Sequence, residues 1–370
     1  MRSVIGWLEQ RFNLTEMFSF LTNFGLFPAD LDTRLPLRDA IRESLERPMP
    51  SYARWPRVLG ILALLLFAFL GITGVMLAFY YQPTPSQAYE SVTILVRDVT
   101  FGWFVHQVHR WGAQLLLLIL LARLWRFYFQ GVYKAPREAL WVVAVLMFLV
   151  AAQSDLTGRL LGWSAGGYWT SVRAMELLYA LPLLGPVFAF LVGGSSIDSL
   201  VLLRFYFLHV VVLPGLLIGL FFINFSGVRR VGLSADPRER RGGSGVYQRY
   251  LFNLLILAVL ILGGLVTLAT LAPNPFEKPA DPYSTPPGAR PPWYLLASYG
   301  FMESFPAFVP RSARGFIVEL ILAACLLVPW IDRSAGRALR ERRVAIAAGI
   351  VVLLAWAFFT WQGYRMESLR

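Results

Sequence analysis

Residues 105–126 read VHQVHRWGAQLLLLILLARLWR, an apolar helix with two histidines near its start and an arginine in its second half. A second stretch, residues 204–230, reads RFYFLHVVVLPGLLIGLFFINFSGVRR and also begins with a histidine ahead of an apolar run. The three histidines of the chain, His106, His109 and His209, therefore lie at equivalent depths of two predicted helices. Two membrane helices that each offer an imidazole can hold one flat metal cofactor between them, and heme b is the usual case.

A histidine inside a membrane helix can also be a polar residue that a neighbouring helix satisfies, so a bound cofactor is not its only interpretation. A matched pair of imidazoles, in a chain with three histidines in all, favours the heme over this alternative.

The composition indicates an integral membrane protein, since 57% of the 370 residues are hydrophobic and 15% are charged. A net charge of +12 could suggest a nucleic-acid partner. The basic residues instead occupy alternate loops between apolar runs, as the positive-inside rule predicts, so no nucleic acid is expected. The one cysteine, Cys325, lies in an apolar run, which excludes a disulfide framework, a CxxCH heme attachment and a cysteine-based metal site.

The hydropathy pattern and the loop charges predict a polytopic all-α protein with its N-terminus in the cytoplasm. Residues 1–27 alternate apolar and polar groups, which is typical of a helix that lies on the membrane surface. Residues 157–200 contain an apolar run too short and broken to span, so we expect surface helices or a re-entrant segment there. Seven transmembrane helices are predicted, over residues 58–81, 101–127, 140–156, 203–225, 251–271, 315–331 and 344–361.

Several motifs resemble those of cytochrome b from bc-type quinol oxidoreductases, in particular the photosynthetic form, in which cytochrome b and a small second subunit are separate chains. The first part of the chain contains VIGWLEQRFNL, GVMLAFYYQPT, FGWFVHQVHRW, KAPREALWV, TGRLLGW, LPLLGPV and LRFYFLHVVVLP. The second subunit's pattern follows in PNPFEKPADP, PPWYLLASYGFMESFP and LLVPWIDR. The resemblance covers nearly the whole chain and implies a fusion of the two proteins.

The fusion implies three parts. Residues 1–57 would form the interfacial helix and a basic cytoplasmic segment. Residues 58–230 would form a heme-binding four-helix bundle, and residues 231–370 a three-helix extension.

The resemblance also implies which residues hold the cofactor. The family binds two b hemes with two histidines on each of the second and fourth spans, and the outer ligands correspond to His109 and His209. The inner ligands correspond to Arg123 and Asn224, neither of which is an ordinary ligand for heme iron. We therefore expect one heme b near the outer face. A covalent extra heme is not expected, because Val58 stands where its cysteine would be. Further cofactor-binding positions are expected at His106, Arg110, Gly74, Gly158 and Arg204.

The outer quinol site implied by the resemblance is altered. The family's Pro-Glu-Trp-Tyr reads Pro291-Pro292-Trp293-Tyr294, and proline cannot accept a proton as the family's glutamate is thought to do. The candidate quinone-site residues are Gly162, Tyr168, Pro292, Trp293 and Tyr294.

Acids elsewhere could replace that glutamate, and the candidates are Glu303 and Asp155. Asp155 and Glu319 both lie inside predicted spans, where buried acids often mark proton paths. The structural alternative is that Asp155 pairs with Arg159 or Arg110 and that Glu319 faces a wet crevice. The sequence leaves the two interpretations open.

These observations predict a b-type cytochrome subunit of a quinol-linked complex in the bacterial inner membrane. Its expected partners are a Rieske-type iron-sulfur or c-type cytochrome subunit, a quinone or quinol, lipid, and a second copy of the chain in a homodimer. The main alternative is a structural anchor for peripheral redox subunits with a vestigial or structural heme. A transporter that uses the cavity of the missing heme is a third possibility, without a motif to support it.

Overall fold

The computed structural model describes residues 14–19, 31–46, 48–50, 58–192, 194, 199–231, 244–334 and 336–366. The described chain is almost wholly helical, and its strands β1 (Pro48–Pro50) and β2 (Ser244–Val246) form one short antiparallel ladder. Most of the interfacial helix predicted over residues 1–27 lies outside the described residues. The first helices are α2 (Leu14–Ser19), α3 (Leu37–Glu46), α4 (Leu59–Ala78), α5 (Ala88–Arg97), α6 (Gly102–Phe129) and α7 (Glu138–Leu161).

The remaining helices follow the third predicted span. Two of them, α8 (Ala165–Tyr179) and α9 (Gly185–Val192), fall within residues 157–200, where surface helices or a re-entrant segment were expected. The fourth predicted span is a continuous rod made of α10 (Ser199–Phe207), a π-helical turn (Leu208–Val212) and α11 (Leu213–Val231). The last helices are α12 (Tyr247–Leu271), α13 (Trp293–Glu303), α14 (Arg311–Leu326), α15 (Val328–Ile331) and α16 (Arg343–Met366).

Six segments within the described residues are long and apolar enough to cross a membrane, which confirms the all-α membrane prediction. They are Leu59–Ala78, Gly102–Phe129, Glu138–Leu161, Leu200–Val231, Leu251–Leu271 and Arg340–Met366. The predicted span over residues 315–331 corresponds to α14, a helix of 16 residues that ends before Leu327, and to the short α15. A bilayer needs about 20 helical residues, so a seventh span remains a prediction.

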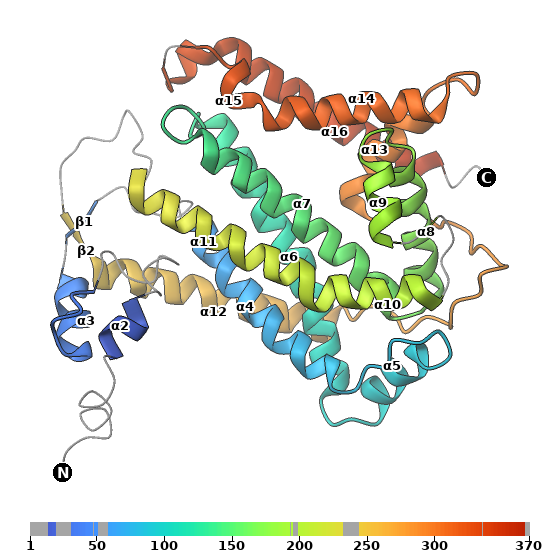
Figure 1. The fold of residues 1–370 in the computed structure, drawn as a ribbon, viewed down its shortest axis with the longest axis horizontal. Helices are drawn as coiled ribbons and strands as arrows, with labels where there is room; N and C mark the ends of the chain where they lie inside the picture. The colour runs from blue at the N-terminus through green and yellow to red at the C-terminus, as the bar shows by residue number, and fades with distance from the viewer. Residues whose placement is uncertain are drawn as a thin grey trace.

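Helices α4, α6, α7 and α11 pack side by side around one apolar core (Figure 1). Leu117, Met147 and Phe221 from three of these helices are fully buried in it. Close approach depends on small residues. A Cβ on Gly112 would lie 2.9 Å from the Leu70 side chain, so α4 and α6 need glycine at this position.

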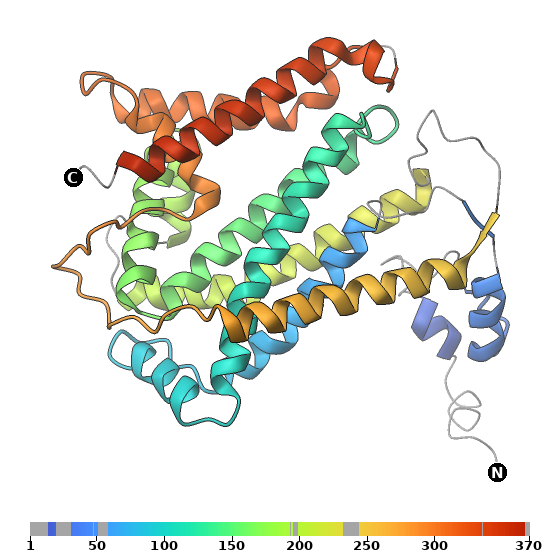
Figure 2. The same cartoon turned by 180° about the vertical axis from the view of Figure 1, so that it is seen from behind.

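The C-terminal helices lie across the bundle, on the side opposite α12 (Figures 1 and 2). Helices α13 and α16 meet backbone to backbone, because a Cβ on Gly300 would lie 2.1 Å from the carbonyl oxygen of Phe359. Gly315 of α14 packs against the turn after α8 in the same way, because a Cβ on Gly315 would lie 2.1 Å from the carbonyl oxygen of Ala180. Glycine at both positions therefore fixes how the second part of the chain docks on the first.

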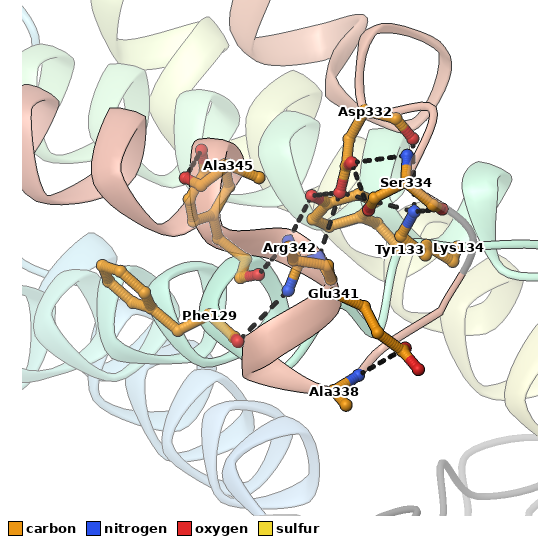
Figure 3. A network of polar contacts seen from close by, with 10 residues as sticks. Phe129, Tyr133, Lys134, Asp332, Ser334, Ala338, Glu341, Arg342 and Ala345 are labelled. Atoms are coloured by element: carbon orange, nitrogen blue, oxygen red, sulfur yellow. Dashed lines mark hydrogen bonds and ion pairs between the residues drawn. The ribbon is translucent and has the colours of Figure 1, made fainter.

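A polar cluster joins the two parts where α6 ends and α16 begins (Figure 3). The buried guanidinium of Arg342 donates to the carbonyl oxygens of Tyr128 and Phe129 and forms an ion pair with Asp332 at 3.0 Å. Tyr133 donates to the same carboxylate at 2.6 Å, and the Lys134 ammonium lies 3.5 Å from it. These bonds satisfy carbonyls that the helix end would otherwise leave open.

The contacts within this cluster shift the pKa values of Asp332 and Tyr133. Burial alone would raise the pKa of Asp332, but hydrogen bonds from Ser334, Tyr133 and Arg342 hold it well below its usual range. Burial and the bond to Asp332 raise the pKa of the Tyr133 phenol. The carboxylate therefore stays charged and the phenol stays protonated at neutral pH.

The outward faces of the long helices are apolar, which suits contact with lipid. Exposure of this much apolar surface to water is unfavourable, whereas its contact with lipid acyl chains is not. Large hydrophobic side chains more than 40% exposed occur on α4, α6, α11, α12 and α16 and include Met76, Leu118, Ile223, Leu260 and Val351.

Candidate heme site and outer polar network

The structure places the imidazole rings of His109 of α6 and His209 of the π-helical turn opposite each other. Their ring centroids are 6.2 Å apart and the ring planes are inclined by 74°. A metal bonded to an imidazole nitrogen at about 2.0 Å lies about 3 Å from the ring centroid, so two rings that share one ion are about 6 Å apart. The separation therefore suits a single ion held between the two imidazoles.

Hydrogen bonds fix the tautomer of both rings. Nδ1 of His209 lies 2.8 Å from the carbonyl oxygen of Ser154, which can only accept, so Nδ1 carries the proton. Nδ1 of His109 lies 2.9 Å from the Thr73 hydroxyl, whose own hydrogen is directed at the Phe69 or Leu70 carbonyl. Both Nε2 atoms consequently keep a free lone pair, as a metal-ligating histidine requires.

Two glycines border the rings. A Cβ on Gly158 would lie 2.6 Å from Cε1 of His209, and one on Gly74 would lie 3.3 Å from Cε1 of His109. Both glycines were expected to border the cofactor, and both contact the paired imidazoles. The ring separation, the tautomers and these glycines together fit a flat cofactor ligated from both faces.

The other three positions expected to bind the cofactor, His106, Arg110 and Arg204, each have different surroundings. Nδ1 of His106 is buried and has no hydrogen-bond partner within the described residues. Arg110 faces the outer end, where its electrostatic neighbours are Arg159, Glu277 and Asp155. Arg204 donates to the carbonyl of Val192 at the end of α9, 2.9 Å away. Its role in the structure is thus to tie α10 to α9.

The Arg123–Asn224 pair, which was predicted to take the place of the family's inner ligands, lies deep in the bundle. Arg123 and Asn224 are 3% and 1% exposed, and the guanidinium donates to the Asn224 side-chain oxygen at 2.5 Å. It also lies 3.7 Å from the sulfur of Met147 and 4.7 Å from the centre of the Phe127 ring. Phe148 packs against the main core.

A polar network centred on Asp155 occupies the C-terminal end of α7. Its Oδ2 accepts from Nε of Arg159 at 2.7 Å and from the Tyr294 hydroxyl at 3.0 Å. Its Oδ1 accepts from the Gln114 amide at 2.6 Å, and the oxygen of that amide accepts from the Trp293 indole at 2.9 Å. Asp155 therefore pairs with Arg159, as one of the two interpretations predicted, and also contacts the Trp293-Tyr294 segment.

Burial, and then the neighbouring charge of Asp155, raise the pKa of the Tyr294 phenol well above its usual value. The phenol consequently remains a hydrogen-bond donor across the physiological pH range.

The remaining acids have other partners. Glu303 closes α13 and forms an ion pair with Arg311 at 3.2 Å. Glu319 is 7% exposed and accepts from the backbone N–H groups of Leu183 and Leu184, at 2.9 and 2.7 Å. The expectation that Glu319 faces a wet crevice is wrong, because this carboxylate caps the turn before α9 and fastens α14 to it.

Gly162 and Tyr168 belong to a separate part of the outer surface. Gly162 ends α7, and the next residue, Trp163, has a positive φ of 42°. Tyr168 packs edge-on against Trp163 with ring centroids 5.5 Å apart. Glu277 holds the start of α8 here by accepting from Ser164 and from the Gly166 N–H. Tyr168 thus lies in a different core cluster from Trp293 and Tyr294, and Gly162 directly precedes Trp163 of that second cluster.

The sequence reasoning missed Thr73, Ser154 and Gln114. Thr73 stands one residue before the expected Gly74, and Ser154 stands one residue before the expected Asp155. A search for polar residues next to these positions could have found both. Gln114 gave no such signal, because its two partners come from α7 and α13.

The fold and the paired imidazoles define a membrane-embedded b-type heme protein, and comparison with known proteins makes this class specific. A family model described as cytochrome b/b6/petB matches residues 44–232, and one described as cytochrome b(C-terminal)/b6/petD matches residues 279–368. The cytochrome b of Allochromatium vinosum is 30% identical over 367 residues, covering 91% of this chain and 88% of the relative. The chain therefore belongs to the cytochrome b family, a membrane subunit family of bc-type quinol oxidoreductases.

The chain joins in one polypeptide the parts that the two family models describe. Cytochrome b6 of Heliobacterium modesticaldum is 37% identical over 210 residues, which are 56% of this chain and 98% of the relative. A chain of a solved hyperthermophilic respiratory complex III has the same fold, with a TM-score of 0.78 at 24% identity over 97% of this chain and 91% of that chain. The expected fusion of a b6-type cytochrome b with its second subunit is confirmed.

Proposed function

We propose that this cytochrome b carries a single heme b near the outer face and passes electrons within a quinol-linked membrane complex. The observation that carries the proposal is the pairing of His109 with His209 at a ring separation of 6.2 Å, with both Nε2 atoms free. When bound, the heme supplies one-electron transfer. The chain's own residues hold it, with Thr73 and the Ser154 carbonyl orienting the two imidazoles.

The Arg123–Asn224 pair supports the loss of the inner heme. Arg123 lies 14 residues after His109, about 21 Å further along the helix. A charged guanidinium and an amide, hydrogen-bonded to each other, take the positions of two iron ligands. Without an inner cofactor this gap is too long for turnover, so electrons leave along the outer face or reach a cofactor of a partner subunit.

The proposed partners are a Rieske-type iron-sulfur subunit or a c-type cytochrome on the outer side. In the proposed topology α14 and α15 form the seventh span, and the N-terminus lies in the cytoplasm of a bacterium. Tyr283 is 98% exposed in the α12–α13 loop and would face outward. In a Cys325→Ala background, a membrane-impermeant maleimide should label Tyr283→Cys in intact cells and Arg333→Cys only after lysis. The reverse pattern would invert the topology.

A structural anchor is the second candidate function, and Pro292 is the observation that favours it. Proline stands where the family has a proton-accepting glutamate, and the inner ligands are absent as well. An anchor would keep the fold and the heme without exchanging electrons with a quinol.

The deciding experiment is addition of a short-chain hydroquinone to the purified complex with its partner subunits present. The b-heme absorption band is followed by stopped flow, and a pyridine hemochrome assay gives the heme content. Reduction of one heme per chain supports the electron-transfer function. An oxidised heme that dithionite reduces and hydroquinone does not would support the anchor.

A further inference from the structure

We propose that Asp155 is the terminal proton acceptor of the outer quinol site and that it receives the proton through the hydroxyl of Tyr294. The inference rests on the proposed function, because it concerns oxidation of a hydroquinone beside Trp293 and Tyr294. It assigns to a residue of α7 the role of the proton-accepting carboxylate, which the Pro291-Pro292-Trp293-Tyr294 segment lacks.

The geometry holds Asp155 in a single orientation. The Trp293 indole can only donate, so it fixes the Gln114 amide with its oxygen toward Trp293 and its nitrogen toward Oδ1 of Asp155. Arg159 donates to Oδ2 at 2.7 Å and is also an electrostatic neighbour of the Tyr294 hydroxyl. The other carboxylate oxygen is thus held by Gln114, and Oδ2 is directed at Tyr294.

The Tyr294 hydroxyl has two acceptors at equal distance, Oδ2 of Asp155 and the carbonyl oxygen of Ala152, each 3.0 Å away. One hydrogen can serve either of them. While Asp155 is charged, Tyr294 donates to it. Once Asp155 is protonated, its new O–H can donate to the tyrosine oxygen while the tyrosine O–H turns to Ala152. Both protonation states therefore keep their hydrogen bonds without any movement of heavy atoms, as a proton relay requires.

Glu303 is the competing acid, and its position disfavours it. It lies ten residues after Trp293 on the same helix, about 15 Å away along the axis. Its carboxylate is engaged by Arg311. Asp155 instead neighbours Ser154, whose carbonyl holds the heme ligand His209. A proton arriving at Asp155 thus stays close to the electron acceptor.

The charged and titratable groups that face Asp155 come from each helix packed against it. They are Arg110 of α6, Arg159 of α7 itself, Tyr294 of α13 and His209 of the π-helical turn. The two arginines place positive charge beside the Asp155 carboxylate.

The step balances as follows. Oxidation of one hydroquinone to quinone releases two electrons and two protons. One electron and one proton go to a one-electron oxidant of the iron-sulfur class in a partner subunit. The heme that His109 and His209 would hold would accept the second electron. The second proton moves from the hydroquinone oxygen to Tyr294 as the Tyr294 proton moves to Oδ2 of Asp155, and the carboxylic acid later releases it to the outer water.

The test uses the whole complex and the variants Asp155→Asn, Asp155→Glu, Tyr294→Phe and Glu303→Gln. Hydroquinone-driven heme reduction should slow about a hundredfold in Asp155→Asn and Tyr294→Phe, and Asp155→Glu should recover part of the rate. Glu303→Gln should match the wild type. The pH dependence of the rate should differ between the wild type and Asp155→Asn. Infrared difference spectra on hydroquinone addition should show a protonated-carboxyl band that is absent in Asp155→Asn.

Dithionite reduction of the heme in each variant reports an intact cofactor. If Asp155→Asn fails to retain heme, Tyr294→Phe, which leaves the Arg159 ion pair in place, decides the question. Wild-type reduction by hydroquinone that continues unchanged in Tyr294→Phe or Asp155→Asn overturns the relay while leaving the proposed function intact. A wild-type heme that hydroquinone does not reduce overturns the proposed function itself, and the relay with it.

Discussion

The guanidinium of Arg123 donates to the side-chain oxygen of Asn224 at 2.5 Å, across the gap between α6 and α11 and with both residues almost fully buried. Because a buried guanidinium without acceptors is costly, this contact explains how a cation is tolerated where the family places an iron ligand.

Loss of the acceptor should destabilise the bundle. We expect Asn224→Leu to lower the free energy of unfolding by about 2–3 kcal/mol, because the charged donor Arg123 would lose its hydrogen-bond acceptor. The double variant Arg123→Met/Asn224→Leu should recover most of that loss, since it removes the buried charge as well. Thermal unfolding in detergent measures both effects. Equal stability of Asn224→Leu and wild type would mean that other groups satisfy Arg123, and heme content should remain unchanged throughout.

The three histidines should differ in how much their replacement by alanine affects the heme content. His109→Ala and His209→Ala should each abolish the b-heme absorption, because each removes one of the two axial ligands. His106→Ala should retain it, since His106 lies one turn away from the facing pair and serves as the matched control. A pyridine hemochrome assay on the purified chain should give one heme per polypeptide in the wild type. A value of two would contradict the proposed role of Arg123 and Asn224.

Gly158 should be intolerant of any side chain. Its Cβ would lie 2.6 Å from the His209 ring, which must then turn away from His109. We expect Gly158→Ala to lose most of its heme or to change the low-spin electron paramagnetic resonance signal of paired imidazoles. Gly162→Ala is the control, because its Cβ would have no neighbour closer than 3.9 Å. Full heme content and an unchanged signal in Gly158→Ala would show that the imidazoles are held differently.

The Asp332 cluster should give a defined pH dependence. The folded pKa of Asp332 is lowered, so its contribution to stability is present above the unfolded value of about 3.9 and is lost as the pH falls through the folded value. Asp332→Asn should cost about 3–5 kcal/mol at pH 7, because it leaves Arg342 buried without its counter-ion. The difference from wild type should shrink below about pH 4.

Thermal unfolding across the pH range measures this difference. Asp98→Asn, at an exposed position, should stay within about 0.5 kcal/mol of wild type. A deficit in Asp332→Asn that stays constant down to pH 2 would contradict the ionic origin of the effect.

Sequence alone placed the long helices and the two histidines that lie opposite each other, and it predicted the Arg123–Asn224 replacement. It could do so because the rise and period of a helix are constant, so residue spacing translates directly into depth and face. Asp155 and Arg159 are four residues apart, and their pairing followed from the same regularity.

Contacts between helices were beyond that reasoning. Arg204 turned to Val192, Glu319 capped the turn before α9, and Gln114 linked Trp293 to Asp155. Each contact depends on how far one helix is rotated and shifted against another, which is set by side-chain packing and by glycines such as Gly112 and Gly300. The sequence therefore determined what each helix carries and at what depth, while the tertiary structure decided which of those groups meet, because the packing of all neighbouring helices fixes their relative register together.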